Sequence, residues 1–170
     1  YGASVWYIQK AETIGLTIGG ALCGTFCYDF AIQLPEGLTA YRAVSDDADA
    51  IYLESIEGIV VPAGTPVLVQ ADEAKTYELT ILSDAAPLGE TNAFSGTLLP
   101  EAIDAGVNAY ILGKKETDEA PRFYLVSEND RTMPANKAYY VATGTQTQGF
   151  RLSFDGTTTG IDSAVTAESG

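Results

Sequence analysis

The chain contains no histidine, only nine Lys and Arg residues, and a single Trp in 170 residues. Without His it lacks the commonest general base and the commonest metal ligand of proteins. Asp and Glu number 23, so the formal net charge is −14. An acidic surface repels nucleic-acid phosphates and anionic lipid headgroups, so neither is an expected partner.

A long hydrophobic segment is also lacking. The longest uncharged run, residues 13–28, is interrupted by four glycines. It is shorter than the ~20 apolar residues that a membrane-spanning helix needs, so no membrane insertion is expected. The sequence begins at Tyr1 and its one Met is Met133. We therefore expect a fragment of a longer chain, with any signal peptide upstream.

Cysteine is scarce, with only Cys23 and Cys27. On one strand their Cα atoms would lie roughly 13 Å apart, whereas a disulfide requires roughly 4.4–6.8 Å. We therefore expect two unpaired, half-buried thiols in a strand. Two ligands alone do not form a zinc site, and neither a metal nor a cofactor is expected.

Alternation of apolar and polar residues dominates what is present. Residues 77–81 read Tyr-Glu-Leu-Thr-Ile and residues 150–154 read Phe-Arg-Leu-Ser-Phe, a pattern typical of strands with one buried face. At most, residues 100–105 are expected to form a helical turn. The remaining expected strands are 5–9, 15–18, 25–32, 39–44, 51–56, 67–70, 94–98, 108–112, 122–126 and 138–142.

Four blocks recur in the same order along the chain. Residues 34–41, Leu-Pro-Glu-Gly-Leu-Thr-Ala-Tyr, are echoed by Leu-Pro-Glu at 99–101 and Gly-Val-Asn-Ala-Tyr at 106–110. The other pairs of blocks are 51–53 with 123–125, 61–64 with 133–136, and 77–81 with 150–154. Collinear echoes indicate a duplicated β unit, although β proteins also reuse turn phrases by chance. In the third pair, Gly64 and Asn136 are expected to adopt positive φ in tight turns.

Together these patterns predict an all-β fold: a β-sandwich, either jelly-roll-like or built from two similar small sub-units. Residues 1–13 are expected to end a preceding β domain or to form a linker. Residues 14–98 form the first half, with its repeat at 34–82. Residues 99–156 form the second half, with its repeat at 99–155, and residues 157–170 form a flexible linker.

The same phrases resemble a β-rich module found near the C-terminus of secreted and surface multidomain proteins of Bacteroides-type gut bacteria. The resemblance spans roughly residues 14–161 and implies a secreted or cell-surface location. Its family offers no catalytic or binding residues to transfer, and it has aromatic or small residues where Cys23 and Cys27 stand. It is carried by residues 23–27, 31–32, 34–41, 59–65, 95–99, 133–139 and 152–156.

Clustered carboxylates raise the question of a glycosidase-type acid pair, which requires one desolvated acid about 5–10 Å from its partner. The clusters fall where hairpin loops are expected, so solvated acids and no catalytic residue are predicted. No Ser or Cys has a recognisable base. Calcium is an alternative for the first cluster, which lacks the glycine and final Glu of a recognised loop. The clusters are Asp46, Asp47 and Asp49; Asp72 and Glu73; and Asp118 and Glu119.

Tyrosine is the one enriched side chain, with ten copies. Tyr52 and Tyr124 occupy the middle of echoed blocks and are expected to face outward at equivalent positions. Aromatic faces stack on sugars, so both are candidates for glycan binding. The alternative is that they cover the sheet as cross-strand partners.

The sequence therefore predicts a non-catalytic structural or adhesive accessory module of a secreted or cell-surface bacterial protein. Its expected partners are neighbouring domains of the same chain, with glycans or surface proteins as further candidates. The alternative is a carbohydrate-binding module that stacks glycans on Tyr52 and Tyr124.

Overall fold

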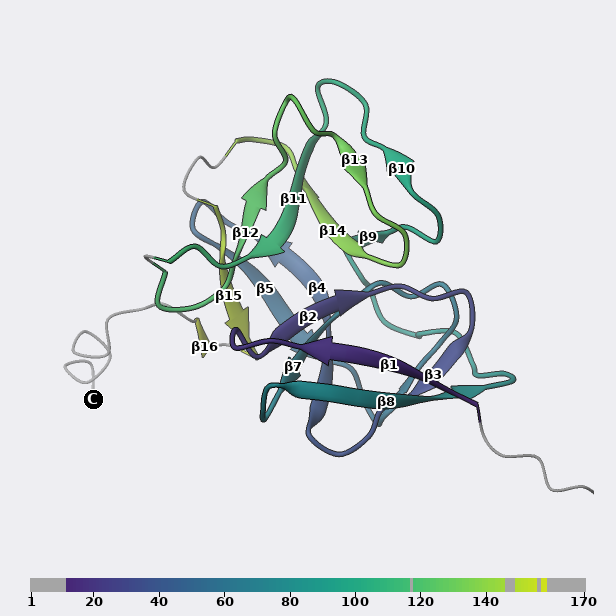
Figure 1. Cartoon of the computed structure of the whole chain (residues 1–170). Coiled ribbons are helices and arrows are strands. Elements are labelled where there is room, and N and C mark those ends of the chain that lie inside the picture. The colour runs from purple at the N-terminus through teal and green to yellow at the C-terminus, as the bar shows by residue number, and fades with distance from the viewer. Residues whose placement is uncertain (1–11, 117, 146–148, 156, 159–170) are drawn as a thin grey trace, which may run out of the picture.

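The computed structural model describes residues 12–116, 118–145, 149–155 and 157–158, and this part of the chain is all-β (Figure 1). The expected strand at 5–9 lies outside these ranges. The expected helical turn at 100–105 is wrong, because Glu101–Ala102 is a strand. The strands are β1 (Thr13–Ile18), β2 (Cys23–Phe26), β3 (Ala31–Gln33), β4 (Leu38–Asp46), β5 (Ala50–Ser55), β6 (Val60–Val61), β7 (Val67–Ala71), β8 (Lys75–Leu82), β9 (Phe94–Gly96), β10 (Glu101–Ala102), β11 (Asn108–Gly113), β12 (Arg122–Leu125), β13 (Thr132–Met133), β14 (Ala138–Ala142), β15 (Arg151–Phe154) and β16 (Thr157–Thr158).

The described strands form four sheets. The first outer sheet has the order β1-β8-β3-β6, and the central sheet has the order β16-β15-β5-β4-β7-β2. The second outer sheet has the order β12-β11-β14-β9, and β10 pairs with β13 as a two-stranded ribbon. β16 falls on the first two residues of the expected C-terminal linker; the remainder of that linker lies outside the described residues.

β7, in the central sheet, is covered on both faces. Along β7, Val67 and Val69 belong to one buried cluster while Leu68 belongs to another. Strands buried on both faces read as continuous apolar runs, which explains the Val-Leu-Val sequence of β7.

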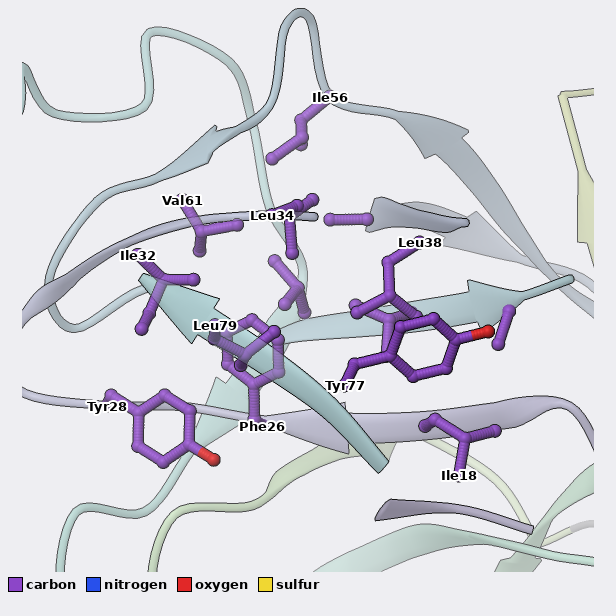
Figure 2. Close-up of a cluster of buried hydrophobic side chains, with 14 residues drawn as sticks. Ile18, Phe26, Tyr28, Ile32, Leu34, Leu38, Ile56, Val61, Tyr77 and Leu79 are labelled. Atoms are coloured by element: carbon purple, nitrogen blue, oxygen red, sulfur yellow. The ribbon is translucent and has the colours of Figure 1, made fainter. Parts of the chain in front are cut away.

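The first core lies between the first outer sheet and the central sheet (Figure 2). Phe26, Tyr28 and Phe30 stack in succession, with ring centroids 5.0 and 5.1 Å apart. The chain crosses between the two sheets at these rings. For this reason the single strand expected at 25–32 is interrupted and becomes β2 and β3.

The second core lies between the central sheet and the second outer sheet, and both halves of the chain contribute to it. Tyr41, Ile51 and Leu68 come from the first half, and Tyr110 and Phe123 from the second, all fully or nearly fully buried. Phe150 pairs with Phe123 through two backbone hydrogen bonds of 3.0 and 2.8 Å. β15 then joins β5 in parallel, so the two halves share one core.

Strand order and register correspond between the halves. The order β5-β4-β7-β2 matches β12-β11-β14-β9, and β3-β6 matches β10-β13. β9 lies before the expected boundary at residue 98 but pairs with β14, so the second half is taken to begin at β9 and the segment between β8 and β9 joins the halves. Ala40 pairs with Val69 as Ala109 pairs with Val141. Turns correspond as well: Gly64 and Asn136 have φ of 73° and 61°, which confirms the expectation for these two positions.

Backbone hydrogen bonds at the turns also recur. Gly64 N donates to Tyr28 O at 2.7 Å, as Asn136 N donates to Thr97 O at 2.8 Å. Leu34 N donates to Ile59 O, and its counterpart is Ile103 N, which donates to Arg131 O. The buried counterpart of Leu34 is therefore Ile103. Leu99, which the Leu-Pro-Glu match pairs with Leu34, is instead 75% exposed.

Candidate functional site

Tyr52 lies on β5, half-buried, between two residues that point into the second core. Its hydroxyl donates a hydrogen bond to the Asp47 carboxylate. The other oxygen of Asp47 accepts the N–H groups of Asp49 at 2.7 Å and Ala50 at 2.9 Å. These bonds lower the pKa of Asp47, the Tyr52 bond contributing most, and the same bond raises the pKa of Tyr52. Asp47 therefore closes the β4–β5 turn around the tyrosine hydroxyl.

Tyr124 lies on β12, and its hydroxyl donates to Asp118 in the preceding loop. The Lys115 Nζ lies 4.3 Å from the centre of its ring, a cation–π contact. A Cβ at Gly149 would lie 2.9 Å from Tyr124 Cδ1, so the Gly149 backbone is packed against the ring. Burial and the bond to Asp118 raise the pKa of Tyr124 to about 12. Parts of this ring are therefore already in contact with the protein itself.

The expected equivalence of Tyr52 and Tyr124 is wrong. Tyr41 pairs with Ser55 in the first half, and its counterpart Tyr110 pairs with Leu125 in the second. Tyr124 consequently corresponds to Glu54. Tyr52 lies two positions earlier on β5 than Glu54 and pairs with Ser45, beyond a β-bulge between Ala43 and Ser45. Spacing along the sequence does not reveal this register. The predicted role of the two tyrosines in glycan stacking stays a prediction.

The acidic loop at residues 46–49 directs its three carboxylates to three partners. Asp46 accepts a 2.5 Å hydrogen bond from the Tyr140 hydroxyl of β14. Asp49 forms an ion pair with Arg151 of β15, with Nε at 3.0 Å. Since Asp47 holds Tyr52, the three acids diverge. Within the described ranges no group of three or more Cys, Asp or Glu residues is placed to hold a metal ion.

The other acidic clusters have similar local partners. The Glu73 side chain forms an ion pair with Lys75 at 3.2 Å, and its backbone oxygen accepts the Tyr77 hydroxyl at 2.8 Å. Asp118 holds Tyr124 and has a lowered pKa, chiefly because of that hydrogen bond. A general acid requires a raised pKa, so the shifts of Asp47 and Asp118 run in the opposite direction from proton donation.

Arg42 is a buried cation that the sequence did not single out. Its Nη1 donates to Thr91 O at 2.6 Å, and its Nη2 contacts Glu54 at 2.5 Å and Glu90 at 3.3 Å. Nearby, Asn92 donates to Pro66 O and accepts the Ala43 N–H. Arg42 and Asn92 thus fasten the segment between β8 and β9 to β4. Partners so far apart in sequence leave no local signal.

The two cysteines are free thiols. Cys23 is half-buried on β2, whereas Cys27 lies just beyond that strand and is buried. Burial raises the pKa of Cys23 to about 11 and also raises that of Cys27. Because the thiolate is the nucleophile and metal ligand, neither is activated for those roles.

Comparisons with models of known protein families, with curated proteins and with solved structures found no match. The described residues contain no helix of the length and hydrophobicity needed to cross a bilayer.

Proposed function

We propose that this protein is a non-catalytic structural or adhesive accessory module of a secreted, cell-surface bacterial protein, placed between or beside other domains of its chain. The observation that carries the proposal is the use of the candidate polar groups. Asp46, Asp49 and Arg42 all bind partners in other strands or in the segment that joins the halves. Groups engaged in this way hold the halves together rather than face a substrate.

A shared core favours the same role. A spacer or adhesive support must keep its shape under load, and the second core contains large side chains from both halves. Unfolding one half would expose the apolar surface that it buries for the other. We therefore infer that the chain unfolds as one unit.

We further propose that the fold is a duplicated β unit, with each copy forming half of a sandwich-like assembly. Matching strand order, matching register at Ala40–Val69 and Ala109–Val141, and matching turn bonds support this origin. Chance reuse of a single turn phrase would not carry so many paired positions with it.

Carbohydrate binding at Tyr52 is the second candidate function. The half-buried ring of Tyr52 lies beside Asp47, and Asp49 and Arg151 lie close by on the adjacent loop and strand. An aromatic face next to charged hydrogen-bonding groups is a common arrangement for sugar recognition. Tyr124 has less free surface because Lys115 and Gly149 contact its ring.

A glycan-array screen of the wild-type protein beside Tyr52→Ala, Tyr52→Phe and Tyr124→Ala separates the two functions. The structural proposal predicts no specific retention by any of the four proteins. Binding that is lost in Tyr52→Ala, retained in Tyr52→Phe, and accompanied by unchanged melting temperatures would contradict it and establish the second function. Tyr124→Ala is the matched control for loss of a tyrosine ring.

A further inference from the structure

Two cavities flank the corresponding turns of the two halves. The first-half cavity, about 410 Å³, lies beside the 62–66 turn. The second-half cavity, about 300 Å³, lies beside Met133, Pro134 and Lys137 and is closed by β2 of the first half. Cavities of this size at the junction of two units are common places for small ligands.

The first-half cavity is lined in part by the segment between β8 and β9. Leu88 and Glu90 line it, and Leu88 also packs against the first core. The Glu90 carboxylate lies 3.3 Å from the guanidinium of Arg42. The apolar side chain of Leu88 and the carboxylate of Glu90 thus lie beside the 62–66 turn, and Glu90 forms an ion pair with Arg42 of β4.

The second-half cavity has an apolar wall and a lysine, and among the described residues none of a segment like that between β8 and β9 lines it. By register, Ile111 stands where the first half has Arg42, and together with Leu112 and Met133 it forms an apolar wall. Among the ion pairs of the described residues none involves Lys137, which lines the same cavity.

Thr25 supplies a second polar group, and its side chain is more than nine-tenths buried. Its hydroxyl oxygen accepts the Ala138 N–H at 3.4 Å. Within the described ranges no acceptor is recorded for its own proton, which remains available to a ligand oxygen. Thr17 and Cys23 also line this cavity. The Thr17 hydroxyl is hydrogen-bonded to that of Thr76 at 2.8 Å, and Cys23, whose pKa burial raises to about 11, stays a neutral thiol at physiological pH.

We propose that the second-half cavity binds a small apolar monocarboxylate, whose hydrocarbon part packs against Ile111, Leu112 and Met133 while its carboxylate accepts hydrogen bonds from Lys137 and Thr25. Charge-assisted bonds of this kind are about twice as strong as neutral ones. The net charge of −14 disfavours multiply charged anions at long range, so a single carboxylate is favoured over phosphate.

Isothermal titration of the intact chain with octanoate, and separately with the uncharged octan-1-ol, tests the proposal. Octanoate is expected to bind saturably at one site. Lys137→Gln is expected to weaken octanoate about tenfold while leaving octan-1-ol unchanged. Ile111→Trp, which enlarges a wall residue, is expected to weaken both probes.

Lys114→Gln is the matched control, because it removes the same charge outside the cavity lining. The proposal is overturned if octanoate shows no saturable binding, or if Lys114→Gln weakens it as much as Lys137→Gln does. It is also overturned if Lys137→Gln weakens octan-1-ol equally. Melting temperatures identify any variant that fails to fold. Because Lys137 is exposed, Lys137→Gln is the variant whose folding is expected to change least.

Discussion

The two halves of this chain pair their strands in the same order but cover them differently. On the face away from the second core, β4, β7 and β2 pack against a four-stranded outer sheet, whereas among the described residues β11 and β14 pack against the β10–β13 ribbon. One difference is the last strand of each half. β8 pairs with β3, whereas β15, its counterpart by sequence, pairs in parallel with β5.

The difference between the two outer layers is measurable at matched positions. Val69 is fully buried, while Val141, in the same register, is 43% exposed. β15 does not add to the outer layer of the second half; it closes the core that the second half shares with the first. One fused assembly is thus favoured over two complete small ones, as expected when small domains bury too little apolar surface alone.

The largest expected effect concerns the two cores. Phe26→Ala in the first core and Phe123→Ala in the second each remove a fully buried ring, at a cost of about 3–5 kcal/mol. Because the central sheet contributes to both cores, each variant is expected to shift a single unfolding transition, measured by urea denaturation with circular dichroism. A biphasic curve, with one phase unchanged in each variant, would mean that the halves unfold independently.

Arg42 and its counterpart Ile111 give the next contrast. Arg42→Ala leaves the Thr91 carbonyl and two carboxylates without their donor and is expected to cost about 2–3 kcal/mol. Ile111→Ala, at a 40% exposed position, is expected to cost less than about 1 kcal/mol. Equal costs in denaturant titrations would show that Arg42 does not fasten the segment between the halves.

Val69→Thr and Val141→Thr make the same chemical change at matched positions. Burying a hydroxyl at Val69 is expected to cost about 1–2 kcal/mol. At the exposed Val141 the change is expected to stay within about 0.5 kcal/mol. The comparison fails if both variants lose stability to the same degree, which would mean that a further layer covers β14.

Among the described strands β10 pairs with β13 alone, which leaves its other edge open. The residues of this edge protect it. Pro100 offers no N–H, and Glu101 stands where the first half has the buried Ile32, by pairing with Met133 as Ile32 pairs with Val61. Proline and charge are common protections of edge strands. The double variant Pro100→Ala with Glu101→Ile is expected to associate, seen as a larger sedimentation coefficient than that of the wild type. An unchanged value would assign the two residues no protective role.

The smallest expected effect is on acid stability. Asp47 and Asp118 have lowered pKa values, so their stabilisation is present above the unfolded-state pKa and is lost as the pH falls through the lower folded-state value. Asp47→Asn and Asp118→Asn should therefore reduce the melting temperature slightly at pH 7 and leave it closer to wild type below about pH 4. A difference from wild type that does not diminish in acid would contradict this assignment.

Much of the strand pattern could be predicted, because alternation reports local burial directly. The two-residue strands β6, β10, β13 and β16 are too short to alternate and were not predicted. The turns of Gly64 and Asn136 were found because positive φ restricts residue type. The register of Tyr52 and the partner of β15 depend on a bulge and on contacts distant in sequence, and no local pattern reports either.

The candidate site was predictable only as residue types. Tyrosine enrichment identifies Tyr52 and the clustering of acidic residues identifies Asp46 and Asp47, but their partners come from the folded register. Tyr140 reaches Asp46 from 94 positions along the chain. Lys137 and Thr25, from opposite halves, meet at one cavity for the same reason.

The pairing of β15 with β5 joins the two halves, and NMR measures it directly. The arrangement predicts backbone NOEs between β15 and β5 in the parallel pattern, with Leu152 beside Ile51 and Phe154 beside Leu53. Antiparallel NOEs between β15 and β10 would contradict the account, because the second half would then complete its own outer sheet as the first half does.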